Sequence, residues 1–396
     1  MSPKTGVIIF EGGLDPRTLL AEVRRWTTLD TTEKFLGHPG VDTVILATDQ
    51  PDLAREAEAL GAAVHRTGPE FHFGQTLQSL VSEQALRRVV FLGGGSVPLL
   101  RTDEADLLLE WVGRGGRRFV ANNAQSPDII GLGSTETVAS LASLRTDNAT
   151  LFALTDSGHE RLLLPETATV SFDLDTPSDV IFLAHEVSRL ARRPAAGAAD
   201  RRGAAGAADR RGAGASGLGS RTTAGLVALR LVLSTLERAA EVLRRPDYLP
   251  VSLVGRVSGP IISYLNANLR VRLRVFSEER GMKALGRLDE GKVRSLLGFV
   301  LEDLGAEYLV ERLDGISDAI FWDTRVLMGH LGRRPDEADR FEADLGRWEK
   351  VRDPALARLC RAAGQAEHPF VLGGHSVVAG GLRLLVEGLL EDSRGG

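Results

Sequence analysis

Cysteine and long apolar runs are scarce in this chain of 396 residues. Cys360 is the only cysteine, which excludes an intrachain disulfide and a cluster of thiolate metal ligands. Its leucine and alanine neighbours recur at helical spacing, so we expect a small buried side chain rather than a nucleophile. No apolar run approaches the roughly 18 residues of a membrane-spanning helix. The opening residues, MSPKTGVIIFEGG, are too short an apolar stretch for a signal peptide. We therefore expect a cytoplasmic protein outside the membrane.

An excess of charge is also missing, because the formal net charge is only −5. Nothing in this balance marks the chain as a nucleic-acid-binding protein. Two phosphate-binding patterns are absent as well: the sequence contains neither GxxxxGK[ST] nor GxGxxG. A P-loop kinase and an ordinary dinucleotide-binding fold are therefore disfavoured. The sequence does not specify an oligomeric state.

The chain contains one segment that is too poor in large apolar residues to fold. Residues 195–212 read AAGAADRRG twice, with nothing apolar larger than alanine. Such a segment cannot bury enough surface to offset the entropy lost on ordering. We predict a disordered Ala/Gly/Asp/Arg linker over 191–220, between an N-terminal domain (1–190) and a C-terminal domain of unknown role (221–396). Limited proteolysis is expected to cut first in this linker.

Before the linker, short runs of Val, Ile and Leu alternate with helical patterns, starting at Val7–Phe10 and continuing through Val44–Ala47 and Val89–Leu92. This βαβα order predicts an α/β fold with a mostly parallel sheet and helices on both faces. In such a sheet the ligand usually lies beyond the carboxyl ends of the strands. The segments that follow strands are therefore the candidate site.

After the linker the periodicity becomes helical, and we predict a mainly α domain. The expected helices are Leu226–Leu243, Val293–Leu304, Ala319–Leu331, Phe341–Trp348, Leu356–Ala363 and Leu382–Leu390.

Arg270, Arg272 and Arg274 alternate, and in a strand they would share one side. They would then bind a polyanion or pair internally with Glu278 and Glu279. Further on, Gly373-Gly374-His375-Ser376 either holds an anion at a helix N-terminus or provides a helix cap at Ser376.

Two glycine-rich turns follow predicted strands in the N-terminal half. The first strand leads into Glu11-Gly12-Gly13, and a later strand leads into Gly93-Gly94-Gly95-Ser96. Without Cβ atoms, such turns let backbone amides approach a phosphate closely. The alternative is a flexible turn or bulge. We interpret both turns as candidate nucleotide-binding loops.

Two carboxylates lie close together in the segment SFDLDTPSDVIFLAHEV, residues 171–187. Asp173 and Asp175 would point to one side of an extended chain, which is unfavourable unless they are solvated or neutralised, commonly by a cation. The alternative is a plain helix start, with Thr176 or Asp175 as cap and Pro177 at the first helical position. We take Asp173 and Asp175 as candidate catalytic residues and ligands for Mg²⁺ or Mn²⁺.

A polar segment follows the predicted strand Phe119–Ala121. It contains Asn122, Asn123, Ser126 and Asp128, whose amide, hydroxyl and carboxyl groups suit recognition of a substrate. The same residue types also form turns, and both interpretations stay open.

The order of these motifs resembles the nucleotide-diphospho-sugar-transferase-like nucleotidyltransferases. The resemblance covers the N-terminal half and is strongest to the molybdenum-cofactor guanylyltransferase and 2-phospholactate guanylyltransferase types. It rests on V-I-I-F…G-G, D-T-V-I-L-A-T-D, V-V-F-L-G-G-G-S-V-P-L-L and F-D-L-D-T-P-S-D-V. The resemblance implies a nucleotidyltransferase-like sheet and a catalytic cation near the second carboxylate motif, here Asp173 to Pro177.

Two motifs depart from that family pattern. Ser96 stands where the family has a metal-binding aspartate in Asp-x-Pro-Leu-Leu, so Glu11, Asp15 or Asp128 would have to replace that ligand. The family's phosphate-wrapping loop with Arg and Lys is short and acidic here, with Arg24, Arg25 and Lys34 as possible substitutes.

We expect a metal-dependent nucleotidyltransferase that acts on an NTP and a phosphorylated or sugar-like acceptor. The alternative is a non-catalytic nucleotide- or ligand-binding regulatory or scaffold protein that retains the fold.

Overall fold

The structure is a computed structural model that describes residues 3–124, 127–192, 217–282 and 286–395. Contacts divide the chain into two compact units. Unit 1 comprises residues 1–174 and 195–228, and unit 2 comprises 175–194 and 229–396. Within the described ranges, every helix is too short or too polar to cross a lipid bilayer.

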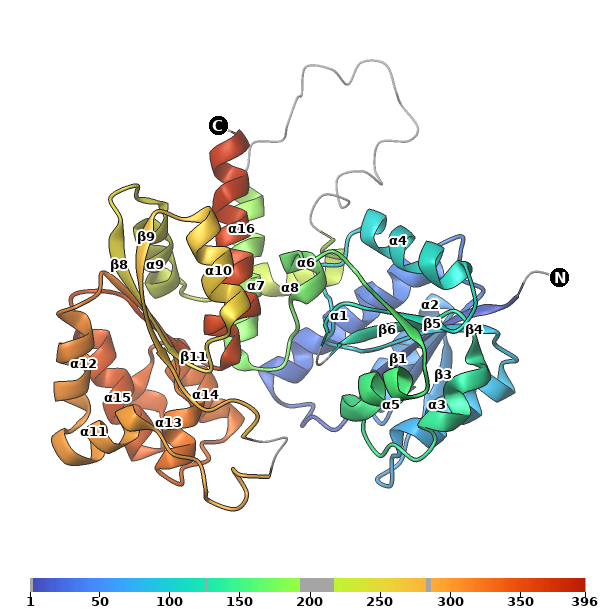
Figure 1. The fold of residues 1–396 in the computed structure, drawn as a ribbon, viewed down its shortest axis with the longest axis horizontal. Coiled ribbons are helices and arrows are strands. Elements are labelled where there is room, and N and C mark those ends of the chain that lie inside the picture. Colours follow the sequence, from blue (N-terminus) through green and yellow to red (C-terminus); the bar gives the residue numbers. More distant parts are fainter. Residues whose placement is uncertain (1–2, 125–126, 193–216, 283–285, 396) are drawn as a thin grey trace. The chain divides into compact units, whose positions relative to one another are not determined.

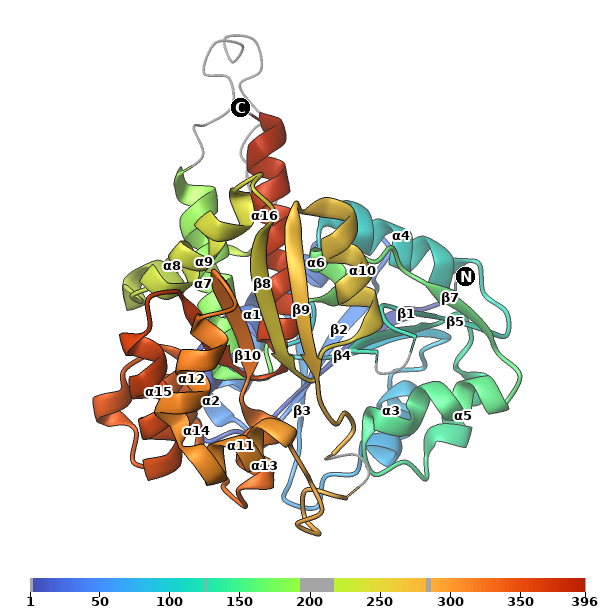
Figure 2. The same ribbon diagram turned by 60° about the vertical axis from the view of Figure 1, so that its left-hand side comes forward.

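Unit 1 contains a seven-stranded sheet in the order β3-β2-β1-β4-β6-β5-β7. All neighbouring strands are parallel except β6, which is antiparallel to β4 and β5. The strands are β1 (Thr5–Glu11), β2 (Thr43–Thr48), β3 (Ala63–Arg66), β4 (Arg88–Gly93), β5 (Arg118–Ala121), β6 (Ile129–Leu132) and β7 (Glu160–Leu163). This mostly parallel α/β sheet confirms the predicted fold class (Figures 1 and 2).

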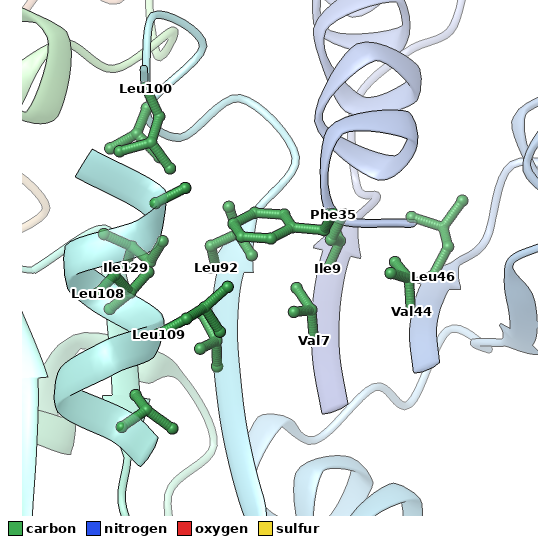
Figure 3. Close-up of a cluster of buried hydrophobic side chains, with 14 of the residues drawn as sticks. Val7, Ile9, Phe35, Val44, Leu46, Leu92, Leu100, Leu108, Leu109 and Ile129 are labelled. Atoms are coloured by element: carbon green, nitrogen blue, oxygen red, sulfur yellow. The ribbon is translucent and has the colours of Figure 1, made fainter. Parts of the chain in front are cut away.

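Helices cover both faces of this sheet because every central strand is apolar on both sides. One face packs against α1 (Leu19–Leu36), α2 (Pro51–Leu60) and α4 (Thr102–Gly113). The other packs against α3 (Phe73–Glu83), α5 (Thr150–Asp156) and the 3₁₀ turn η1 (Thr135–Leu141). In Figure 3, Phe35 of α1 lies over the strands beside Ile9 and Leu92, and α4 brings Leu108 and Leu109 to the same cluster. This packing fixes the strand ends that carry the candidate site.

Unit 2 contains a four-stranded, wholly parallel sheet in the order β11-β10-β8-β9. Its strands are β8 (Leu249–Gly255), β9 (Val271–Ser277), β10 (Ala319–Asp323) and β11 (Phe370–Gly373). Helices are α7 (Pro177–Arg192), α9 (Ser234–Arg244), α10 (Gly259–Asn268), α11 (Leu296–Leu304), α12 (Ala306–Asp314), α13 (Arg325–His330), α14 (Glu337–Asp344), α15 (Pro354–Gln365) and α16 (Gly380–Gly395). Most residues in regular structure here are helical, as predicted, but the sequence did not predict the sheet.

Three of the predicted C-terminal helices are wrong in part. The expected helix Phe341–Trp348 continues only to Asp344, the last residue of α14. The expected helix Ala319–Leu331 begins with strand β10, whose five residues are all buried, and becomes helical only at Arg325. A short apolar run does not distinguish a buried strand from a buried helix. The expected helix Leu226–Leu243 is interrupted between α8 (Ser220–Leu229) and α9. Arg230 at the break has a positive φ of 46°, which a helix does not allow.

Each unit includes one segment that lies, in the sequence, on the other side of the predicted linker. Helix α7 precedes it but packs on α16, α14 and β11 of unit 2. The segment 217–228, with most of α8, follows it but belongs to unit 1, where Asp30 of α1 accepts hydrogen bonds from the backbone and hydroxyl of Thr222 at 2.8 and 2.7 Å. The observed division therefore differs from the predicted boundaries at 190 and 220. Residues 193–216, most of the predicted linker, lie outside the described residues.

Helix α7 buries a histidine whose titration should make stability depend on pH. His185 is 5% exposed, and burial together with nearby guanidinium groups lowers its pKa to about 4. The unfolded chain binds this proton near pH 6.5 and the folded chain does not, so stability should fall as the pH drops from about 6.5 to 4. When the pH is lowered from 7 to 4, the unmodified protein should lose about 3 kcal/mol more unfolding free energy than His185→Gln. Urea titrations at several pH values measure this difference, and parallel pH profiles for the two proteins would contradict the prediction.

Candidate functional site

The first strand of unit 1 ends on a buried ion pair. Glu11, the last residue of β1, has a side chain that is 1% exposed, and Arg24 of α1 lies against it. The guanidinium of Arg24 donates from Nη2 to Oε2 of Glu11 at 2.9 Å and from Nε to both carboxylate oxygens at 3.2–3.3 Å. Its Nη1 donates to the carbonyl of Leu174 at 3.1 Å. Arg24 is therefore bonded within the unit on two sides.

The side chains of Glu11 and Arg24 pack against the glycine turn that follows β4. A Cβ atom on Gly94 would lie 2.3 Å from both Oε2 of Glu11 and Oγ1 of Thr28. A Cβ on Gly95 would lie 2.9 Å from the carbonyl oxygen of Leu174 and 3.0 Å from the guanidinium of Arg24. Real Cβ atoms do not approach so closely, so these glycines are needed for packing within the protein. The packing alone accounts for Gly94 and Gly95.

The turn after β1 also contacts a carboxylate of the chain itself. The amide of Gly13 donates to Oδ2 of Asp49 at 3.2 Å, and a Cβ on Gly12 would lie 2.8 Å from Oδ1 of that aspartate. Asp49 follows β2, the parallel neighbour of β1. Asp15 is held by Arg17, with 2.7 Å between Oδ2 and Nη2. The predicted phosphate-binding turn therefore faces negative charge, which would repel a phosphate.

Ser96 and Asp173 lie side by side, as the family resemblance implies for the corresponding positions. They form an isolated antiparallel β-bridge. The amide of Leu174 donates to the carbonyl of Gly95 at 3.1 Å, which holds the segment 172–174 along the turn after β4. Oδ1 of Asp173 accepts a hydrogen bond from the amide of Leu174 at 3.0 Å. Unit 1 thus brings two of the predicted site residues together.

Asp175 begins unit 2 and belongs to the start of helix α7. Its amide donates to Oδ2 of Asp179 at 3.1 Å, and the same oxygen accepts from the amide and hydroxyl of Thr176 at 2.6 and 2.7 Å. Helix α7 begins at Pro177, as the helix-start interpretation predicted. The capping oxygen, however, belongs to Asp179 and not to Thr176 or Asp175, the two caps predicted from the sequence.

The donor set for a divalent cation is incomplete in unit 1. Ser96 offers a hydroxyl where the family has a carboxylate, and Oδ1 of Asp173 accepts from the amide of Leu174. In the ranges that the structure describes, no three His, Cys, Asp or Glu side chains come together as a metal site would require. Divalent cations favour several oxygen ligands, commonly from more than one carboxylate. The residues present therefore do not fit a resident Mg²⁺ or Mn²⁺ ion.

The three possible replacement ligands are engaged elsewhere. Glu11 bonds Arg24, Asp15 bonds Arg17, and Oδ2 of Asp128 accepts from Nδ2 of Asn122 at 3.0 Å. Asn122 is 6% exposed, donates to the carbonyl of Val170 at 2.9 Å and accepts from the amide of Asp128 at 2.9 Å. It closes the turn between β5 and β6, in agreement with the turn-forming interpretation. Asn123 is exposed, and Ser126 lies outside the described residues.

The basic residues proposed to replace the family's phosphate-wrapping loop are also bonded within the protein. Arg25 pairs with Glu56. Lys34 donates from Nζ to the carbonyls of Leu100 and Gly217, and burial lowers its pKa to about 8. Neither contact was predicted, because each partner is distant in sequence from the basic residue that it binds.

Two of the alternating arginines, Arg272 and Arg274, lie on edge strand β9, where both residues are exposed, so binding of a polyanion stays a prediction. Arg272 donates from Nε to the carbonyl of Tyr248 at 2.7 Å, and Arg274 donates to that of Ile316 at 2.9 Å. Glu279 instead pairs with Arg287. These arginines therefore satisfy backbone carbonyls beside the sheet rather than nearby glutamates.

No family model and no curated protein matches this chain. Several solved structures are similar over about half of it. A cytidylyltransferase from Leptospira borgpetersenii is 16% identical, covers 47% of this chain and 87% of its own, and has a TM-score of 0.39. A CMP:2-keto-3-deoxy-manno-octonic acid synthetase complexed with CTP is 14% identical, with coverages of 41% and 90% and a TM-score of 0.33. A Mycobacterium tuberculosis protein in complex with manganese is 18% identical, with coverages of 44% and 95% and a TM-score of 0.32.

These similarities are structural and remote. The first two are to cytidylyltransferases rather than to the guanylyltransferase types that the sequence suggested. At such identities and TM-scores they assign no substrate and no activity to this chain, so function must be argued from its own residues.

Proposed function

We propose that unit 1 is a nucleotidyltransferase-like domain that acts as a non-catalytic regulatory or scaffold module. The observation that carries this proposal is the Glu11–Arg24 ion pair packed onto Gly94 and Gly95. A nucleotide-binding loop needs backbone amides and cations that face open space. Here the glycines accommodate the protein's own side chains, and Arg24 is neutralised by Glu11.

Electrostatics supports the same proposal. A triphosphate at the turn after β1 would meet the carboxylate of Asp49, whereas Arg24 and Arg25 are already paired with Glu11 and Glu56. A carboxylate close to a polyanion repels it unless a metal intervenes. Because Ser96 stands in place of the family's aspartate, unit 1 lacks one of the carboxylate ligands that would hold such a metal.

A second candidate is metal-dependent nucleotidyl transfer. The Ser96–Asp173 bridge favours it, because it aligns the two segments that the family resemblance associates with the cation. In this candidate Asp173 and Asp175 would hold Mg²⁺ or Mn²⁺, Gly12, Gly13 and Gly93–Ser96 would face the nucleotide, and the segment with Asn122, Asn123, Ser126 and Asp128 would face the acceptor. The cation would supply charge neutralisation at the α-phosphate.

Binding of Mn²⁺ alone distinguishes the two candidates. The non-catalytic module predicts no saturable Mn²⁺ binding in calorimetric titrations of the full chain, and no change on Asp173→Asn. The transferase predicts saturable binding that Asp173→Asn removes and that Ser96→Asp tightens by about tenfold or more, because it restores a carboxylate. Asp52→Asn removes an exposed carboxylate that is paired with Arg55 on α2 and is the charge-matched control. Binding that is lost in Asp173→Asn and kept in Asp52→Asn would overturn the non-catalytic proposal.

A further inference from the structure

The sequence left an anion site open at two segments of unit 2. One of them, Gly373-Gly374-His375-Ser376 before α16, is filled by the protein itself. Oγ of Ser376 accepts from the amide of Gly381 at 3.0 Å, and Oγ of Ser178 accepts from that of Gly374 at 3.0 Å. The predicted cap at Ser376 is therefore confirmed for this segment. The arginines of β9 are the candidate that remains.

Strand β9 is an edge of the four-stranded sheet and pairs with β8 alone. The pairing runs one to one from Leu249 with Val271 to Gly255 with Ser277, without a bulge. Its seven residues, VRLRVFS, include neither proline nor glycine. Natural sheets protect an edge by making it short or bulged, by covering it, or by placing proline or charge on it. Strand β9 is neither short nor bulged nor interrupted by proline, so only its arginines could act as such protection.

The outer side of β9 carries peptide groups that no described residue binds. The amide of Glu278 donates to the carbonyl of Gly255 at 2.8 Å. Because bonding to a parallel neighbour alternates along a strand, the amides and carbonyls of Val271, Leu273 and Val275 point away from β8. Within the described ranges, no backbone hydrogen bond joins them to another segment. This edge is therefore able to pair with a further strand.

The arginines lean over the sheet and leave its edge open. Nε of Arg272 donates to the carbonyl of Tyr248 at 2.7 Å, and Nε of Arg274 donates to that of Ile316 at 2.9 Å. Tyr248 immediately precedes β8, and Ile316 precedes β10. Both side chains thus extend from β9 toward the interior strands. They do not cover its outer side, as charges that protect an edge would.

The same arginines carry positive charge without a carboxylate partner. Their Nη atoms make no hydrogen bond or ion pair with a residue that the structure describes, and neither does the exposed side chain of Arg270. A guanidinium that is held at Nε presents its remaining donors in a fixed direction. Other exposed arginines of unit 2 pair with acidic neighbours: Arg245 with Asp247, Arg312 with Glu311, and Arg352 with Asp336.

An extended acidic peptide matches both features of β9. Its backbone would pair with the outward amides and carbonyls, whereas a nucleic acid would match the charge but not the alternating donors and acceptors. A second copy of β9 would bring arginines against arginines, which is unfavourable. Side chains alternate between the faces of a sheet, so carboxylates at every second position would lie on the face of Arg272 and Arg274. The positions between them would continue the apolar face of Val271, Leu273 and Val275.

We propose that β9 binds an extended segment of a partner protein in which acidic and apolar residues alternate. The segment adds a strand to the sheet of unit 2, and its carboxylates accept hydrogen bonds from Arg272 and Arg274. This surface lies wholly within unit 2 and is independent of the function proposed for unit 1.

Titration of the full chain with a labelled peptide of alternating valine and glutamate tests the proposal by fluorescence anisotropy. The peptide should bind saturably, and its counterpart of valine and lysine should not. Arg272→Gln with Arg274→Gln should weaken binding by about tenfold or more, because it removes the charge-assisted hydrogen bonds. The matched control is Arg358→Gln with Arg361→Gln on α15, which packs on β11 at the opposite edge of the sheet. This control should leave the affinity unchanged.

Two further measurements test the backbone pairing. The peptide methylated at every backbone nitrogen keeps its charges but loses its donors, so it should not bind. In the complex with the unmethylated peptide, hydrogen exchange should slow at the amides of Val271, Leu273 and Val275. The amides of Arg272 and Arg274 face β8 and should change little.

Four outcomes would overturn the proposal. They are the absence of saturable binding, equal weakening by the α15 control, equal affinity for the methylated peptide or for single-stranded DNA, and a dimer in gel filtration whose outward β9 amides are already protected without peptide. The last of these would assign the edge to a second copy of the chain.

Discussion

A fragment of residues 193–396 should fail to form a stable fold, whereas residues 175–396 should melt cooperatively. The two fragments differ only in helix α7 with its preceding turn, which lies before the predicted linker but belongs to unit 2. Both contain the whole C-terminal domain expected from the sequence. The comparison therefore tests whether the domains end where the composition changes.

The expected loss is large because α7 is almost entirely buried. Val180, Ile181, Phe182, Leu183 and Val187 are each at most 6% exposed. Burial of one such side chain contributes roughly 1.5–3 kcal/mol, so the set contributes on the order of 10 kcal/mol. This matches the whole stability of a typical domain, about 5–15 kcal/mol.

Charged contacts add to the dependence on α7. Arg189 is 6% exposed and bonds Glu186 on its own helix together with Glu391 and Asp392 of α16. Without α7, Glu391 and Asp392 would lose their contacts with Arg189, and Arg244 of α9 would stay 4.0 Å from Asp392.

Circular dichroism melts and gel filtration measure the outcome. We expect a broad or absent transition for residues 193–396, and recovery of a cooperative transition on co-expression with residues 1–192. Equal melting temperatures for the 193–396 and 175–396 fragments would show that α7 is dispensable and that the domain boundary predicted from the sequence is correct.

The sequence predicted the central strands β1, β2 and β4 of unit 1 well because each contains an apolar run bounded by polar turns. It did not predict β6 or β7, and β7 reads Glu-Arg-Leu-Leu. Val7–Phe10, Val44–Ala47 and Val89–Leu92 lie within β1, β2 and β4 as expected. The sheet of unit 2 was not predicted, because β10 runs into α13 with only Thr324 between them and the apolar pattern continues across the join. The helices around it were easier to predict, since their periodicity extends over more residues.

The candidate site was harder to predict than the fold. Glycines after strands were correctly identified as positions of close approach, but the approaching group could not be known. For Gly94 it comes from Glu11 and Thr28, and for Gly95 from Arg24 and Leu174, which lie between 66 and 83 residues away. A bound phosphate and a packed side chain both need a residue without Cβ to approach the backbone closely, so the local sequence contains glycine in either case. Only the tertiary contacts distinguish them.

Arg24→Met is expected to destabilise unit 1 by about 3–5 kcal/mol, because it leaves the buried carboxylate of Glu11 without its cation. Arg25→Met at the next position is the matched control. Arg25 pairs with Glu56 across the surface, where both side chains are 38–41% exposed, and its loss should cost under about 1 kcal/mol. Urea denaturation of both variants at pH 7 measures the difference. The contrast arises from burial, since the two substitutions are otherwise identical.

The double variant Glu11→Met with Arg24→Met should recover most of the stability lost in Arg24→Met, because an apolar pair replaces the ion pair without leaving a buried charge. Such recovery would indicate that Glu11 and Arg24 stabilise the fold by neutralising each other and are not held for a ligand. A cost for Arg24→Met no greater than that for Arg25→Met would indicate the opposite. Arg24 would then be available to a phosphate, as nucleotidyl transfer requires, and the non-catalytic proposal for unit 1 would lose its main support.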